Sequence, residues 1–337
     1  MRKGVAVGLV ALLVIVAVGC RKDLDFDGDG KADLIYLDTE NGAWYRLNPS
    51  PQPPTLLADG HGPWAPGDYD GDGKWEPGAA SGSTWWSQTA GTQTLARPSE
   101  DRAHQAYVDM VPADYDGDGT TDPAFYQEAT ATWFIEGQAP VVFGTTASGT
   151  YANVYDQDYP VPADYDGDGK ADLSTYNPAT AAWRIRSSKT GLESSAVVGP
   201  PGSFPVPADY DGNGKADRAI VGGGGTWVIE GQPSNPVFGP ALPLGGDGTT
   251  SWWPAVADYD GDGKADLAYV QFPSQVDHAP SSWHIRESKS GLAQTYTIPG
   301  SASTGVHPVP AAMDFDLVIS TARIVLAGKC AAPGSNC

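Results

Sequence analysis

The feature that most constrains this chain is a nine-residue acidic motif that occurs six times. The first copy runs Asp25-Phe-Asp-Gly-Asp-Gly-Lys-Ala-Asp33, and the others begin at Asp68, Asp114, Asp164, Asp209 and Asp258. Successive copies start 43, 46, 50, 45 and 49 residues apart. A self-similar period of this length is typical of a β-propeller or a solenoid and disfavours a string of independent domains.

The segments between the motifs predict short strands. A short apolar run such as residues 267–270 follows each motif, and a turn then leads to a segment centred on a tryptophan. In residues 183–186 and 283–286 apolar and polar side chains alternate, as in a half-buried strand. We therefore expect an all-β chain, a β-propeller of four-stranded antiparallel blades. The tryptophans expected in the core between blades are Trp44, Trp85, Trp133, Trp183, Trp227 and Trp283.

The acidic motif has the oxygen pattern of a calcium loop. Positions 1, 3, 5 and 9 supply side-chain oxygens, position 7 can add its backbone carbonyl, and hard oxygen ligands at this density suit Ca²⁺. The glycine at position 6 permits the sharp turn. Position 12 is Thr175 in the fourth copy and the flanks are strands, so an EF-hand is rejected. The expected ligands of about six sites are Asp25, Asp27, Asp29, Lys31, Asp33, Asp68, Asp70, Asp72, Lys74, Glu76, Asp114, Asp116, Asp118, Thr120, Asp122, Asp164, Asp166, Asp168, Lys170, Asp172, Asp209, Asp211, Asn213, Lys215, Asp217, Asp258, Asp260, Asp262, Lys264 and Asp266.

The charge balance agrees with this assignment. The formal net charge of −21 disfavours a nucleic-acid partner. Five loops carry four carboxylates each and the fifth loop carries three, so more than half of the 41 acidic residues lie in the motifs. Carboxylates this close repel one another unless a cation binds. Extracellular calcium modules bind at roughly 10⁻⁴ to 10⁻³ M, which favours a structural role over a signalling role.

The repeat resembles the bacterial FG-GAP/VCBS family, and integrin α-subunit heads are similar at a greater distance. The resemblance rests on Asp-Tyr-Asp-Gly-Asp-Gly-Lys-Ala-Asp-Leu, led by Pro-Val-Pro-Ala and followed by Thr-x-Trp, and it covers residues 21–328. It implies seven blades, with residues 309–320 as a degenerate seventh unit that lacks the acidic loop. In the alternative of six blades, residues 309–313 complete the first blade, which lacks a full first strand of its own.

The N-terminus predicts export. A basic start, Met1-Arg2-Lys3, precedes an apolar run over residues 5–18, the usual length of a signal-peptide core. Ala17-Val-Gly-Cys20 resembles the lipobox of bacterial lipoproteins, which implies a lipidated Cys20 and a membrane-anchored chain facing the periplasm or the cell surface; plain secretion is the alternative. We divide the chain into a signal peptide (1–19), the propeller (20–329) and a tail (330–337), in which Cys330 and Cys337 are free to form a disulfide.

The sequence favours binding over catalysis. None of the five histidines lies in a zinc-type pair, and no nucleophile elbow or phosphate-binding glycine loop is present, so we do not expect an enzyme. We expect a surface adhesion or scaffold module that binds an extracellular or cell-surface protein. The alternatives are a lectin and, less favoured, a polysaccharide-active enzyme. Burial of the aromatics available for sugar stacking would favour adhesion: Trp64, Trp75, Trp86, Trp252 and Trp253.

Overall fold

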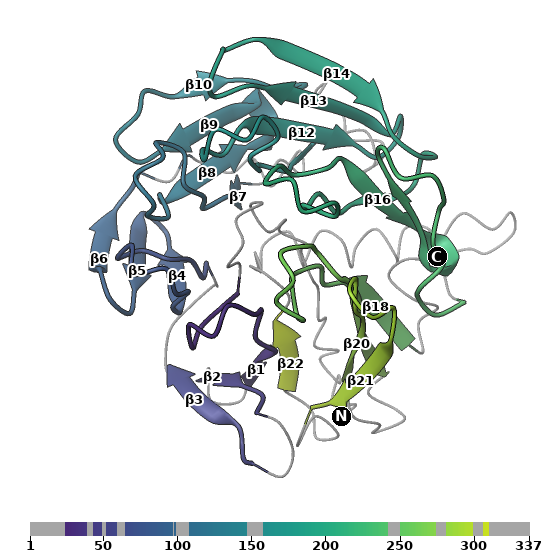
Figure 1. The fold of residues 1–337 in the computed structure, drawn as a ribbon. Helices are drawn as coiled ribbons and strands as arrows, with labels where there is room; N and C mark the ends of the chain where they lie inside the picture. Colours follow the sequence, from purple (N-terminus) through teal and green to yellow (C-terminus); the bar gives the residue numbers. More distant parts are fainter. Residues whose placement is uncertain are drawn as a thin grey trace, which may run out of the picture.

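The chain forms a ring of antiparallel β-sheets around a common centre (Figure 1). The structure, a computed structural model, describes residues 24–38, 43–48, 52–58, 65–96, 98, 108–146, 158–241, 250–273, 281–298 and 306–309. Six sheets of three or four strands account for nearly all of its regular structure. Among the described residues, two short 3₁₀ turns, η2 (Glu128–Thr130) and η4 (Gly223–Gly225), each connect two consecutive strands. The expected all-β propeller is confirmed.

Each sheet forms one blade. Blade 1 contains β22 (Val306–Val309), β1 (Ile35–Asp38), β2 (Ala43–Arg46) and β3 (Thr55–Ala58). Blade 2 contains β4 (Gly78–Ser81), β5 (Thr84–Ser87) and β6 (Gly91–Thr94). Blade 3 contains β7 (Val108–Met110), β8 (Ala124–Gln127), β9 (Thr132–Ile135) and β10 (Val141–Val142).

The remaining three blades follow in chain order. Blade 4 contains β11 (Tyr159–Pro160), β12 (Leu173–Asn177), β13 (Ala182–Arg186) and β14 (Glu193–Val197). Blade 5 contains β15 (Phe204–Pro205), β16 (Ala219–Gly222) and β17 (Thr226–Ile229). Blade 6 contains β18 (Thr250–Pro254), β19 (Leu267–Pro273), β20 (Ser282–Arg286) and β21 (Ala293–Thr297).

The last described strand closes the ring by joining the first blade. β22 pairs with β1 in an antiparallel register that opposes Val309 to Ile35 and Val306 to Asp38 (Figure 1). This pairing matches the six-blade alternative. The favoured count of seven blades is not confirmed, because the described residues form six sheets and Val309, the first residue of the expected seventh unit, pairs with β1 in the first sheet. The rest of that unit lies outside the described residues.

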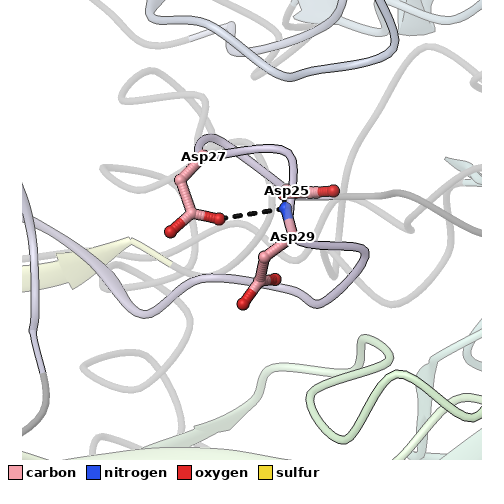
Figure 2. Close-up of side chains that lie close together, drawn as sticks. All are labelled: Asp25, Asp27 and Asp29. Atoms are coloured by element: carbon pink, nitrogen blue, oxygen red, sulfur yellow. Dashed lines mark hydrogen bonds between the residues drawn. The ribbon is translucent and has the colours of Figure 1, made fainter.

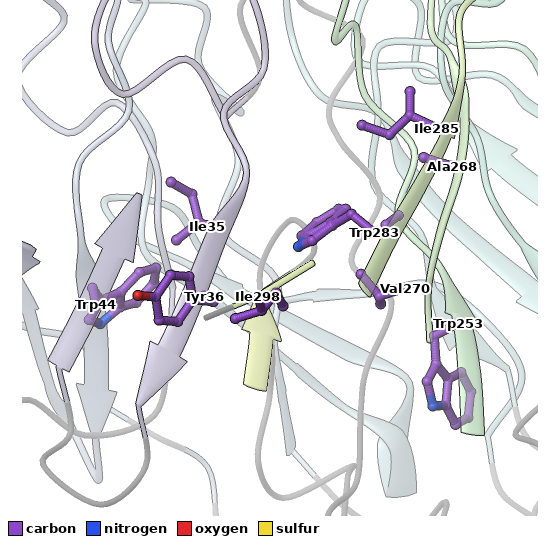
Figure 3. Close-up of a cluster of buried hydrophobic side chains, with 10 residues drawn as sticks. Ile35, Tyr36, Trp44, Trp253, Ala268, Val270, Trp283, Ile285 and Ile298 are labelled. Atoms are coloured by element: carbon purple, nitrogen blue, oxygen red, sulfur yellow. The ribbon is translucent and has the colours of Figure 1, made fainter. Parts of the chain in front are cut away.

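The core consists of apolar contacts between neighbouring blades. All six predicted tryptophans are buried, with at most 1% of each residue exposed. At the closing interface Trp44 and Ile35 of blade 1 lie in one cluster with Trp283, Val270 and Ile285 of blade 6 (Figure 3). A blade buries its tryptophan against the adjacent blade, as predicted, because one sheet cannot cover both of its own faces. The described part of the chain contains no helix with the length and apolar character needed to cross a bilayer.

Candidate metal centre

The six acidic motifs lie in equivalent places along the repeat. In blades 3 to 6 the motif connects the first and second strands, and in blades 1 and 2 it directly precedes β1 and β4. We number them loop 1 (25–33), loop 2 (68–76), loop 3 (114–122), loop 4 (164–172), loop 5 (209–217) and loop 6 (258–266). In loops 2 to 6 a β-bridge joins the residue before position 1 to position 9, as in Ala163↔Asp172. In loop 1 the Asp33 amide donates to the Leu24 carbonyl at 2.9 Å. Backbone pairing therefore holds the two ends of every loop together.

The first carboxylate of each loop is fixed by backbone amides. In loop 4 the Asp164 Oδ1 accepts from the Gly167 amide at 2.5 Å, and its Oδ2 accepts from the Gly169 amide at 2.8 Å. Both glycines have positive φ, 78° and 86°, a backbone conformation that disfavours other residues. Position 9 is held as well, since the Asp172 Oδ2 accepts from the Tyr165 amide at 2.9 Å.

The carboxylates converge in space. In loops 2 to 5 one oxygen each from positions 1, 3 and 9 lies within 4.8 Å of the others, as for Asp164, Asp166 and Asp172. In loop 1 the converging set is positions 1, 3 and 5, namely Asp25, Asp27 and Asp29 (Figure 2). Acidic oxygens held this close by the backbone fit a hard divalent cation.

Backbone hydrogen bonds join the six loops into a closed ring. In every case the amide at position 8 donates to the carbonyl of position 1 in a neighbouring loop. The distances are 2.8 Å for Trp75 to Asp25, 2.6 Å for Thr121 to Asp68, 2.7 Å for Ala171 to Asp114, 2.8 Å for Ala216 to Asp164, 2.7 Å for Ala265 to Asp209 and 2.7 Å for Ala32 to Asp258. The last of these links loop 1 to loop 6, so the ring closes after six loops.

The lysine at position 7 adds a second contact between loops. The Lys170 ammonium donates to the Asp116 carbonyl at 2.5 Å, and the Lys215 ammonium donates to the Asp166 carbonyl at 2.8 Å. Position 7 was predicted as a ligand through its carbonyl. The structure shows in addition that its side chain reaches the preceding loop.

The tyrosine at position 2 connects each of loops 2 to 6 to the core. In loop 4 the Tyr165 hydroxyl donates to the Val161 carbonyl at 2.9 Å, and its ring lies edge-on to Trp183 with 6.2 Å between ring centroids. Tyr115 and Tyr259 contact Trp133 and Trp283 in the same way. Sequence reasoning missed this role, although the recurrence of Tyr at position 2 in five loops would have indicated it.

Partial burial makes the carboxylates at position 9 harder to ionise. Desolvation raises the pKa of Asp33, Asp122, Asp217 and Asp266 to about 6 and that of Glu76 to about 7. Backbone hydrogen bonds oppose this shift, and neighbouring aspartates reinforce it. Burial disfavours the charged form of these carboxylates, and a cation bound beside them would stabilise that form.

The raised pKa values predict how the calcium-free protein responds to pH. Because these groups have a pKa near 4 when unfolded and about 6 to 7 when folded, the folded chain binds more protons across that window. The free energy of unfolding should therefore fall as pH rises from about 4 to about 7. We expect a higher melting temperature in EDTA at about pH 5 than at about pH 7.5, measured by circular dichroism. Excess Ca²⁺ should abolish or reverse this order, and a melting temperature in EDTA that rises with pH would contradict the prediction.

The other residues singled out from the sequence fall into three groups. Trp252 and Trp253 are buried, with 0% and 7% of each residue exposed, so they belong to the core. Trp75 and Trp86 are half-buried. Trp64, Cys20, Cys330 and Cys337 lie outside the described residues.

Comparisons with known proteins find a repeat family in two regions of the chain. The family model of the FG-GAP-like repeat matches residues 25–76 and 209–269. No curated protein shows significant similarity to the chain.

Several solved structures match at low identity. A structure of an Agrocybe aegerita lectin, described as recognising non-reducing terminal N-acetylglucosamine, is 17% identical with a TM-score of 0.48, over 90% of this chain and 83% of the lectin. AofleA from Arthrobotrys oligospora is 10% identical with a TM-score of 0.43, over 86% of this chain and 90% of its own. Virginiamycin B lyase from Staphylococcus aureus is 11% identical with a TM-score of 0.42, over 83% of this chain and 89% of its own.

The family match agrees with the acidic loops. Residues 25–76 contain loops 1 and 2, and residues 209–269 contain loops 5 and 6. The two matched regions therefore hold four of the six acidic loops.

Proposed function

We propose that this chain is an exported β-propeller stabilised by Ca²⁺, which acts as a non-catalytic adhesion or scaffold module. The observation that carries the calcium role is the ring of acidic loops, in which carboxylate oxygens from separate positions converge within 4.8 Å. The cation would neutralise carboxylates that the fold partly desolvates. It would also stabilise a face where all six loops are hydrogen-bonded to their neighbours.

The expected magnitude favours a structural role for calcium. At about 1 mM Ca²⁺ and a Kd of about 0.1 mM, each site adds about 1.4 kcal/mol to the free energy of unfolding. Several such sites together approach the whole stability of an ordinary domain, which is about 5–15 kcal/mol. The calcium concentration outside cells is steady, so the ion would act as a permanent part of the fold.

Removal of calcium should lower the melting temperature strongly. We expect EDTA at about pH 7.5 to destabilise the chain by several kcal/mol, and excess Ca²⁺ to restore it. Differential scanning calorimetry measures both steps. Mg²⁺ at the same concentration is the control, because it prefers octahedral sites that retain water and should restore less. An unchanged melting temperature in EDTA would exclude the structural role.

The position of the aromatics supports a protein partner over a glycan. Trp252 and Trp253, the strongest candidates for sugar stacking, are buried between blades and unavailable to a ligand. Large aliphatic side chains are exposed on the last strands of three blades instead, at Leu56, Val142 and Val197. A partner protein at this outer rim would remove them from water, with a favourable free energy of about 25 cal/mol per Å².

We further propose that the mature chain is held to a membrane by lipid on Cys20. The basic start, the apolar run and the small residues before Cys20 support this proposal. Fractionation of cells that produce a Cys20→Ser variant is the test. Loss of the chain from the membrane fraction is expected, and membrane retention equal to that of the wild type would overturn the proposal.

Carbohydrate binding is the second candidate, favoured by a polar pocket between blades 4 and 5. Its walls include Asp166, Ser187, Ser194, Arg218 and Glu230. Arg218 and Glu230 form a bidentate ion pair, with N···O distances of 2.7 and 2.8 Å. The cavity is about 180 Å³, below the roughly 300–1,000 Å³ of pockets for drug-sized ligands, so it would accept a small polar group.

A glycan array separates the two candidates. We expect residues 21–337 in excess Ca²⁺ to give no specific binding, in agreement with a protein partner. Binding to one glycan class that is lost in an Arg218→Ala variant would establish the pocket as a sugar site and overturn the adhesion proposal. An Arg286→Ala variant, which changes an arginine of blade 6 outside the pocket, is the matched control.

A further inference from the structure

Loop 1 differs from the other loops through one residue of its own blade. Two residues after the core tryptophan, blades 3 to 6 carry a buried isoleucine and blade 2 carries a buried serine. The strand register is the same in all of them, so the position is equivalent. At this position blade 1 has an arginine. The residues are Arg46, Ser87, Ile135, Ile185, Ile229 and Ile285.

The Arg46 guanidinium contacts two carboxylates of loop 1. Its Nη1 forms an ion pair with the Asp27 Oδ2 and lies 3.4 Å from the Asp33 Oδ1. Asp27 and Asp33 occupy positions 3 and 9. The arginine side chain is only 19% exposed, and β2 directs it from the sheet face that carries Trp44. The Arg46 Nη1 therefore contacts the carboxylates at positions 3 and 9 of loop 1. In loops 2 to 5 the carboxylates at these two positions converge with the one at position 1.

The converging oxygens of loop 1 differ accordingly. Loops 2 to 5 bring together positions 1, 3 and 9, whereas loop 1 brings together positions 1, 3 and 5 and leaves Asp33 out. In loops 4 and 6 the Oδ1 of position 9 accepts from a neutral backbone amide, Ser188 at 2.7 Å and Ser288 at 2.6 Å. Two ion pairs of the described residues involve an acidic loop, and Arg46 makes both of them.

We propose that Arg46 is the resident cation of loop 1, and that this loop therefore binds no Ca²⁺ while loops 2 to 6 bind one ion each. The proposal rests on the proposed calcium role of the other loops. Guanidinium stays protonated at every physiological pH, so it places a permanent positive charge beside Asp27 and Asp33. A calcium ion would have to displace it from Asp27 and Asp33 against charge repulsion. The displaced side chain would also remain between blades, where its Nε is already buried without a partner.

Loop 1 is the place where a permanent cation has the largest structural effect. Its Ala32 amide donates to Asp258 of loop 6, and its Asp25 carbonyl accepts from Trp75 of loop 2. The same blade receives β22, so the ends of the described chain meet here. An arginine holds this junction together at any calcium concentration.

The test is the calcium stoichiometry of the full chain, measured by equilibrium dialysis with metal analysis. We expect five ions per wild-type chain and six in an Arg46→Ile variant, which carries the residue of blades 3 to 6. Arg186→Ile is the matched control, because Arg186 is one position further along its strand than Ile185 and projects from the opposite face; it should stay at five. Six ions on the wild type, or five on Arg46→Ile, would overturn the proposal.

A second pair of variants keeps the test decisive if Arg46→Ile does not fold. Asp33→Asn should leave the stoichiometry at five, whereas the equivalent change Asp122→Asn in loop 3 should remove one ion or weaken one site at least tenfold. Equal losses in both variants would overturn the assignment of Arg46. Absence of calcium binding by the folded wild-type chain is a different result, because it would contradict the proposed calcium role of loops 2 to 6.

Discussion

The fold depends on the hydrogen bonds that join one acidic loop to the next. The residue at position 1 has two roles, since its carboxylate accepts the glycine amides of its own loop while its carbonyl accepts an amide from a neighbouring loop. A cation held by Asp164 would therefore stabilise the contact between loops 4 and 5 as well as loop 4 itself. Because six such contacts close a ring, the loss of one ion would weaken both the site and its neighbours.

The tyrosine at position 2 carries the same coupling into the apolar core. Tyr165 lies between Asp164, a candidate ligand, and Trp183, which is buried against the next blade. Its hydroxyl donates a hydrogen bond to the carbonyl of Val161, which follows β11. The fold thus places partly desolvated carboxylates about one ring width from its largest buried side chains. Burial raises the pKa of Asp172 and of Asp258, which marks an electrostatic cost that a bound cation would offset.

The features predicted correctly from the sequence are those that a single unit encodes. The glycine turns, the core tryptophan and the grouping of acidic side chains follow from one motif and its flanking strands, whereas the full set of ligand positions stays a prediction. The sequence left the number of blades open between seven and six, because the partner of β1 lies about 270 residues away and the short segment 306–309 carries no recognisable motif. The contacts between loops were missed because they use backbone amides, which any residue supplies. Arg46 was visible in the sequence, and alignment of the units on their tryptophans would have shown an arginine where four units carry isoleucine.

Six copies of one motif therefore need not be six equal sites. Loops 2 to 6 are connected to their neighbours through continuous chain, so the entropy lost when they meet is small. The junction of loop 1 with loop 6 and β22 brings distant parts of the chain together, and closing a long loop costs more entropy than closing a short one. A calcium ion at this junction would make the closure of the ring depend on the free calcium concentration. An arginine supplied by the chain itself removes that dependence, at the cost of one metal site.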